Sequence, residues 1–174
     1  MLAASDLHDH VAQLSPPARR ILIDGPSGAG KTTLAQQLAP LGYLILHLDD
    51  WYPGWDGLAA GSALTEDLLT SDRPAFPRWD WAKGRVSEWV PVDPTRPWVV
   101  EGCGSLTPGT AALADLRLWC DVPAEVAHQR GLARDGAAYE PWWERWHRQE
   151  QQHWERHRPW TLADIRVDCR DADS

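Results

Sequence analysis

Eight consecutive residues of this 174-residue chain have the types and spacing that bind phosphate. They fit the pattern G-x-x-x-x-G-K-S/T, in which backbone N–H groups, a lysine and a hydroxyl surround an anion. Glycines allow the backbone conformations that turn those N–H groups inward. This phosphate loop (residues 25–32) comprises Gly25, Pro26, Ser27, Gly28, Ala29, Gly30, Lys31 and Thr32, and Thr33 follows it directly.

The residues on either side of the loop have the patterns that such a loop requires. An apolar run at residues 21–23 predicts a short buried strand, and residues 33–39 predict a helix that Pro40 ends. The N-terminus of that helix adds a positive partial charge. We therefore predict that the chain binds a nucleoside triphosphate, with Lys31 at the β- and γ-phosphates and Thr32 on Mg²⁺. ATP is the default, because no recognisable guanine-specifying motif is present.

Acidic side chains follow two further predicted strands. Asp49 and Asp50 come after the apolar run at residues 43–48, and Glu101 follows residues 98–100. Ligands of open α/β sheets bind beyond the carboxyl ends of the strands, the edge that also carries the phosphate loop. Asp49 could accept a proton from an attacking hydroxyl or hold Mg²⁺ through water, whereas a solvated Asp-Asp turn would do neither. Glu101 could coordinate Mg²⁺ through water or merely cap its strand.

Together these segments resemble the uridine kinase-like branch of the P-loop kinases. The resemblance rests on GPSGAGKT at the phosphate loop, LDDWY at residues 48–52 and VVEG at residues 99–102, and it runs in order to about residue 167. It implies that Asp49 is the catalytic base and that Glu101 serves the metal. Asp50 occupies a position where that family often has Ser or Asp, and we count it as a further candidate for the metal shell.

Two arginines of a predicted helix at residues 126–134 suit a lid over the phosphates. Arg130 and Arg134 are spaced i, i+4 and therefore share one face. P-loop kinases resemble one another in having such a lid, which implies a lid region at about residues 126–140 and a catalytic role for both arginines. The planar guanidinium is always charged and bonds oxygen atoms in pairs. A solvated basic face is the alternative.

Residues 51–97 are rich in Pro, Gly and Trp, and we interpret them as an insert on the acceptor side. One or two short helices are expected in it, near residues 63–69 and 81–89. An aromatic ring can stack on a flat acceptor while charged groups fix its polar edge. The family's Phe-Asp-His-Pro type of sequence is absent here, so the identity of the acceptor is left open. The candidate acceptor-binding residues are Asp49, Tyr52, Arg78, Trp79, Asp80 and Trp81.

The helix predicted at residues 140–157 carries an aromatic stripe at helical spacing. We expect this face to pack on the sheet. Glu150 is an acidic residue on this otherwise aromatic stripe, and we expect it to face the acceptor pocket. His153 and His157 are spaced i, i+4 and could ligate a transition metal, although no third ligand is evident.

Strands alternate with helices along the whole chain, which predicts an α/β fold with a parallel sheet covered on both faces. The resemblance implies a three-layer α/β/α P-loop NTPase domain with a five-stranded parallel sheet in the order 2-3-1-4-5. The length suits one domain, residues 1–174. A net charge of −8 argues against a nucleic-acid partner. Three scattered cysteines, no signal sequence and no bilayer-length apolar run predict a cytoplasmic protein that is not in a membrane.

The sequence thus predicts ATP- and Mg²⁺-dependent phosphorylation of a small hydroxyl-bearing acceptor, for example a nucleoside or a related metabolite. One alternative is a regulatory ATPase that transfers phosphate only to water. Another is a nucleoside monophosphate kinase, for which Arg73, Arg78 and Arg85 could bind the acceptor phosphate. Oligomeric state is left open.

Overall fold

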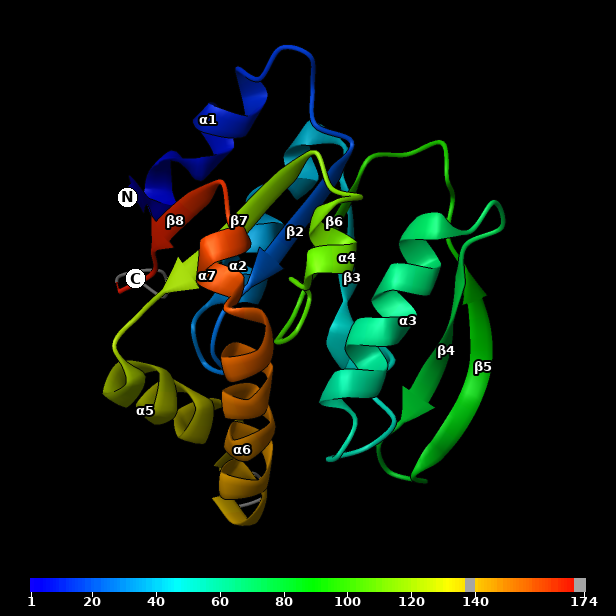
Figure 1. Ribbon diagram of the computed structural model, residues 1–174, viewed down its shortest axis with the longest axis vertical. Coiled ribbons are helices and arrows are strands. Elements are labelled where there is room, and N and C mark those ends of the chain that lie inside the picture. Colours follow the sequence, from blue (N-terminus) through cyan, green and yellow to red (C-terminus); the bar gives the residue numbers. More distant parts are fainter. Residues whose placement is uncertain (137–139, 171–174) are drawn as a thin grey trace.

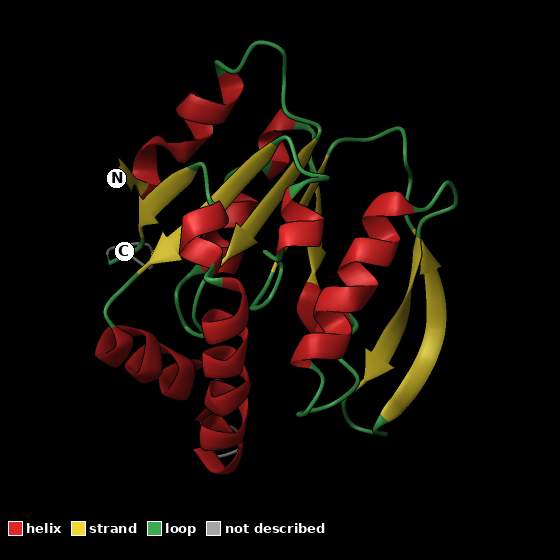
Figure 2. Ribbon diagram, in the orientation of Figure 1, coloured by secondary structure: helices red, strands yellow, loops and turns green. Residues whose placement is uncertain are grey.

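The computed structural model describes residues 1–136 and 140–170, so residues 137–139 of the predicted lid region lie outside the described part. The described residues form an α/β fold around one parallel sheet, with a separate hairpin at one side (Figures 1 and 2). Across the sheet the strand order is β1-β8-β7-β2-β6-β3. The strands are β1 (Leu2–Ala3), β2 (Arg20–Asp24), β3 (Leu44–His47), β6 (Trp98–Glu101), β7 (Leu116–Asp121) and β8 (Ile165–Asp168).

The five predicted strands occur in the predicted order, with β2 at the centre. The predicted strand number was one too low, because β1 adds a sixth strand at the edge, parallel to β8. It contains only two residues. A strand so short has no periodicity that a sequence pattern could reveal.

Helices cover the sheet and extend beyond its carboxyl edge, where α5 and α6 lie together (Figure 1). A short 3₁₀ turn, Leu48–Asp50, carries the two adjacent aspartates directly after β3. The α-helices are α1 (Leu7–Ala12), α2 (Lys31–Gln36), α3 (Leu58–Thr70), α4 (Pro108–Ala111), α5 (Ala124–Asp135), α6 (Glu140–His157) and α7 (Pro159–Leu162). No described helix has both the length and the apolar character needed to cross a membrane.

The central strand is buried on both faces, as expected for a parallel sheet with helices on both sides. Ile21 and Ile23 enter one hydrophobic core, which contains side chains of α1 and α2. Leu22, between them, enters a second core with residues of α3, the hairpin and α6. Because successive strand residues point to opposite faces, three apolar residues in a row serve both cores.

The hairpin replaces a helix that the sequence analysis expected at residues 81–89. Strands β4 (Ala75–Asp80) and β5 (Arg85–Pro91) pair antiparallel, and the turn between them ends at Gly84, with φ +62°. That helix prediction was wrong. The valines and the tryptophan in the Arg-Val-Ser-Glu-Trp-Val run of β5 are residue types that are favoured in strands, although polar and apolar residues do not alternate regularly there. The other predicted helix of the insert, at residues 63–69, is confirmed as part of α3.

Helix α3 approaches the segment after β3 so closely that only glycine fits at the contact. A Cβ on Gly61 would lie 2.4 Å from the ring of Tyr52. That ring is fully buried, and its hydroxyl donates a hydrogen bond to the Cys103 carbonyl at 2.6 Å. The Gly61 carbonyl in turn accepts from the Trp51 indole at 3.2 Å. These contacts fix the residues that follow the two aspartates.

We predict that Gly61→Ala destabilises the protein by about 1–3 kcal/mol, the usual cost of overpacking a core. Helix propensity alone would give the opposite sign, since alanine is favoured over glycine by about 1 kcal/mol inside a helix. Urea unfolding measures the difference. Ala63→Gly, at an exposed interior position of the same helix, is the control and should cost about 1 kcal/mol. A stabilised Gly61→Ala protein would show that Tyr52 can move aside.

Candidate active site

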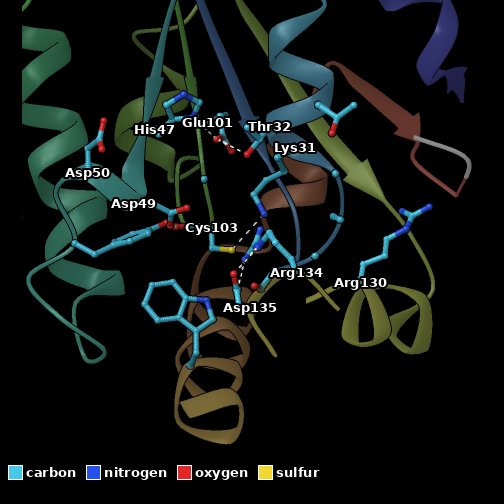
Figure 3. A pocket seen from close by; sticks show the side chains of 18 of the residues that line it. Lys31, Thr32, His47, Asp49, Asp50, Glu101, Cys103, Arg130, Arg134 and Asp135 are labelled. Carbon is cyan, nitrogen blue, oxygen red and sulfur yellow. Dashed lines mark hydrogen bonds and ion pairs between the residues drawn. The ribbon is translucent and has the colours of Figure 1, made fainter. Parts of the chain in front are cut away.

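The carboxyl ends of β2, β3 and β6 open into one cavity of about 980 Å³ (Figure 3). The phosphate loop forms one end of it, and aromatic side chains of the insert and of α6 form the other. Among the residues singled out from the sequence, the cavity is lined by Ser27, Gly28, Ala29, Gly30, Lys31, Thr32, Thr33, Asp49, Asp50, Tyr52, Trp81, Glu101, Arg130 and Arg134.

The phosphate loop has the backbone conformation that its glycines permit. Gly28 and Gly30 have φ values of +80° and +87°, in the left-handed region. A Cβ on Gly28 would lie 1.9 Å from the carbonyl oxygen of Ala127, so α5 packs directly on the loop. The Lys31 ammonium donates to the carbonyl oxygens of Gly25 and Pro26 at 2.9 and 2.7 Å. The loop and its lysine are therefore held together before any ligand binds.

Lys31 is charged in this buried position. Burial by itself would lower the pKa of Lys31, but negative groups around it, Glu101 and Glu150 among them, raise that pKa overall. The Cys103 thiol, 3.4 Å from the ammonium, is itself kept neutral because burial raises its pKa well above the usual value. The two glutamates therefore provide the compensating charge.

Thr32, Glu101 and His47 form a compact polar group beside the loop. The Thr32 hydroxyl donates to Glu101 Oε1 at 2.9 Å, and His47 Nδ1 lies 2.6 Å from the same oxygen. His47 and Glu101 are neighbours in the register of β3 and β6. The hydrogen bond to Glu101 raises the pKa of His47. A hydroxyl and a carboxylate are hard oxygen ligands of the kind that Mg²⁺ takes, so this pair fits the predicted metal.

The two aspartates after β3 have different surroundings. Figure 3 shows Asp49 near Lys31 and Arg134, whereas Asp50 lies on the far side of Asp49 from them. Asp49 is exposed at the cavity surface. The cavity walls still limit its contact with bulk water and raise its pKa, and the negative charge of Glu101 raises the pKa further, whereas the positive charge of Lys31 lowers it. Neither a hydrogen bond nor an ion pair joins Asp50 to Thr32 or Glu101 in the described part of the chain. Its predicted place in the metal shell stays a prediction.

The arginines of α5 also differ. Arg134 lines the same cavity as Lys31 and Cys103 (Figure 3) and pairs with Asp135 at 2.7 Å. Arg130 donates to the carbonyl oxygens of Cys169 and Arg170, which follow β8, so it fastens α5 to the sheet as well as lining the cavity. The predicted role of both arginines at the phosphates stays a prediction.

The acceptor end contains only some of the predicted residues. Trp81 lines it and donates from its indole to the Asp49 carbonyl at 2.9 Å. Arg78 and Asp80 bond instead within the hairpin, to Glu88 at 2.8 Å and to Lys83 at 2.8 Å, and neither they nor Trp79 line the cavity. Trp55 and Trp146 line it without having been assigned there from the sequence. They come from a loop and a helix far apart in the chain, so no local pattern connects them.

Helix α6 buries three side chains of its predicted stripe, Trp146, Glu150 and His153. Trp146 packs in the core against Tyr52, ring centroid to ring centroid 4.8 Å. Glu150 contacts the phosphate loop rather than the acceptor end, because its Oε1 accepts from the Ser27 N–H at 2.7 Å. His153 and His157 lie close together, but the described residues contain no group of three potential ligands that could hold a metal ion.

Comparison with known proteins identifies the fold. No protein-family model matches the chain, and no curated protein matches its sequence significantly. Among solved structures it is similar to a possible uridine kinase from Bacillus stearothermophilus, with 20% identity, a TM-score of 0.64, and 95% of this chain and 97% of the other covered. It is also similar to a candidate fructose transport system kinase from a Silicibacter species, with 18% identity, a TM-score of 0.57, and coverage of 96% and 98%. The chain therefore has the P-loop kinase fold that its motifs predicted.

The contact between His147 and Glu150 generates a measurable prediction. His147 Nδ1 lies 3.2 Å from Glu150 Oε2, and this hydrogen bond raises the pKa of His147. The stabilisation from protonated His147 should therefore be complete below about pH 6.5, the ordinary histidine value, and should be lost as the pH rises through the higher folded-state value. NMR titration of the imidazole should show the raised pKa, and Glu150→Gln should return it to the ordinary range. Glu155→Gln, exposed on the same helix, should leave it raised. An ordinary pKa in the unaltered protein would contradict the contact.

Proposed function

We propose that the protein is an ATP-dependent phosphotransferase that phosphorylates a hydroxyl group of a small acceptor. The observation that carries this proposal is the shared cavity. A complete phosphate loop, a carboxylate suited to act as a base and an aromatic wall all face one space. The two similar solved structures are described as kinases, which supports the same activity.

The nucleotide end supplies positive charge and N–H donors. The N-terminus of α2 and the phosphate loop would hold the phosphate oxygens, and Lys31 would exchange its loop carbonyls for the β- and γ-phosphates. Arg134 lines the cavity nearby and can neutralise charge on the phosphoryl group in transit. Catalysis of this kind relies mainly on positioning and electrostatic stabilisation.

Mg²⁺ would be held by Thr32 and Glu101, and when bound it supplies positive charge to the phosphate oxygens. His47 would contribute to metal binding indirectly, because its 2.6 Å contact with Glu101 restrains the orientation of that carboxylate.

Asp49 would receive the proton of the acceptor hydroxyl. Its raised pKa brings the carboxylate closer to the working pH, which favours proton transfer. The hydrogen bond from Trp81 to the Asp49 backbone ties this residue to the hairpin. Aromatic rings then offer the acceptor an apolar face, and these are Tyr52, Trp55, Trp81 and Trp146. A nucleoside or a related metabolite would fit such a site.

The alternatives have less support. A nucleoside monophosphate kinase would need cations for the acceptor phosphate, but Arg73, Arg78 and Arg85 do not line the cavity, and Arg78 pairs with Glu88. A regulatory ATPase would need no acceptor site, whereas here an aromatic wall adjoins the phosphate loop.

Glu101→Gln should raise the Mg²⁺ concentration needed for half-maximal activity more than it weakens metal-free nucleotide binding, because glutamine lacks the charge that attracts the cation. Activity titrated with Mg²⁺, together with calorimetry of ATP in a chelator, provides both numbers. Asp50→Asn is the matched control and should shift the Mg²⁺ requirement less. Equal changes in metal-free binding and Mg²⁺ requirement would make Glu101 a structural residue.

Asp49→Asn should reduce acceptor-dependent ADP release by about 10²–10⁴-fold, the usual contribution of a positioned general base. ATP binding should stay nearly unchanged, since asparagine keeps the size and hydrogen-bonding capacity of the side chain. A coupled assay over nucleosides, sugars, vitamins and other alcohols would first identify the acceptor. The proposal fails if no acceptor stimulates ADP release, or if the variant retains full turnover with a true acceptor.

A further inference from the structure

Glu150 of α6 contacts the phosphate loop from behind. Its side chain is 1% exposed and is not among the residues that line the cavity. Glu150 Oε1 accepts from the Ser27 N–H at 2.7 Å and from the Cys103 thiol at 3.1 Å, and Oε2 lies 3.2 Å from His147 Nδ1. The carboxylate is therefore surrounded by donors and lies behind the phosphate loop, outside the cavity lining, so its role is structural rather than substrate-facing.

This contact restrains a segment that would otherwise have many conformations. Three of the eight loop residues are glycines, which lose more backbone freedom on ordering than any other residue. A hydrogen bond to a buried carboxylate is stronger than a neutral one and fixes the direction of the N–H group. A loop that is ordered in advance binds its ligand with a smaller entropic cost.

The same helix reaches the acceptor end one turn earlier. Trp146 and Glu150 are four residues apart, so they lie on one face of α6. Trp146 lines the cavity and packs edge-on against Tyr52. Hydrogen bonds also connect the aromatic end of the cavity to Glu150 behind the phosphate loop. The Tyr52 hydroxyl donates to the Cys103 carbonyl, and the Cys103 thiol donates to Glu150.

We propose that Glu150 is a positioning residue for the phosphate loop. We also propose that α6 couples the packing of Trp146, in the aromatic wall where the acceptor would bind (the acceptor wall), to the order of that loop. The statement about the acceptor wall rests on the proposed function. The statement about the loop does not, since it concerns nucleotide-free protein.

Amide hydrogen exchange of the nucleotide-free protein tests the contact directly. Ser27 should be protected in the unaltered chain, and Glu150→Ala should accelerate exchange of the loop amides by about tenfold or more, as expected for loss of a buried hydrogen bond to a charged group. The same variant should weaken ATP binding by about 10–100-fold. Glu150→Gln keeps an acceptor oxygen for Ser27 and should recover most of both properties. Glu144→Ala, exposed on the same helix, should change neither.

Trp146→Ala tests the coupling. It should also accelerate exchange of the loop amides, although Trp146 makes no hydrogen bond to the loop. Loop exchange unaffected by this variant would overturn the coupling. An unprotected Ser27 amide in the unaltered protein would overturn the positioning role, even if Glu150→Ala did not fold. Failure to find any acceptor, with loop exchange as predicted, would count against the phosphotransferase and leave Glu150 as the positioning residue of a nucleotide site.

Discussion

The site depends on one buried carboxylate, Asp24, at the carboxyl end of the central strand. Its Oδ1 accepts from the backbone N–H groups of Gly25 and Gly104 at 2.7 and 3.1 Å, and its Oδ2 accepts from Leu106 at 2.9 Å. Burying an ionised group is costly unless hydrogen bonds compensate for lost water, and three backbone donors do so here. Asp24 thereby joins the start of the phosphate loop to the segment that follows β6. Helix α6 adds His153, whose Nε2 lies 3.4 Å from Asp24 Oδ2.

The sheet register determines the rest of the arrangement. Glu101 is level with Ile23 on one side and with His47 on the other, so the parallel strands bring its carboxylate next to Thr32 at the start of α2. The turn after β3 then carries Asp49 toward the same space. Three strand ends and one helix start thus bring the phosphate loop, the Thr32–Glu101 pair and the Asp49 carboxylate to one cavity.

The sequence predicted the parts of this arrangement that depend on local patterns. The phosphate loop, the five strands and the acids at residues 49 and 101 could be recognised because glycine spacing and short apolar runs each have a local physical cause. The order of the strands, in contrast, followed only from the resemblance to P-loop kinases. The contact between Glu150 and Ser27 could not, since it joins residues 123 positions apart. His47 ended a predicted strand, and only its register with Glu101 shows its role. The hairpin was missed because polar and apolar residues do not alternate regularly in β5, so no period-two pattern marked it as a strand.

The aromatic wall is likewise built from residues far apart in the chain, which local sequence patterns do not connect. Trp55 stacks on Trp142, with ring centroids 5.4 Å apart, and meets Trp81 edge-on at 5.1 Å, so a loop, a helix and a hairpin turn supply one surface. The chain contains twelve tryptophans, and no local sequence pattern says which of them share a surface. Residues 78–80 were assigned to the acceptor because the resembled family has acceptor-binding residues at this place in the chain. In the hairpin, however, Arg78 pairs with Glu88 of β5 and Asp80 pairs with Lys83 of the turn.

The most direct measurement follows the γ-phosphoryl group itself. The protein would be incubated with ATP labelled at the γ-phosphate and with fractionated pools of small metabolites, and mass spectrometry would locate the label. If one cavity holds both donor and acceptor, the label should appear as a phosphate ester on an organic hydroxyl, and the ester should depend on an intact Asp49. Label recovered entirely as inorganic phosphate, whichever pool is added, would contradict a phosphotransferase.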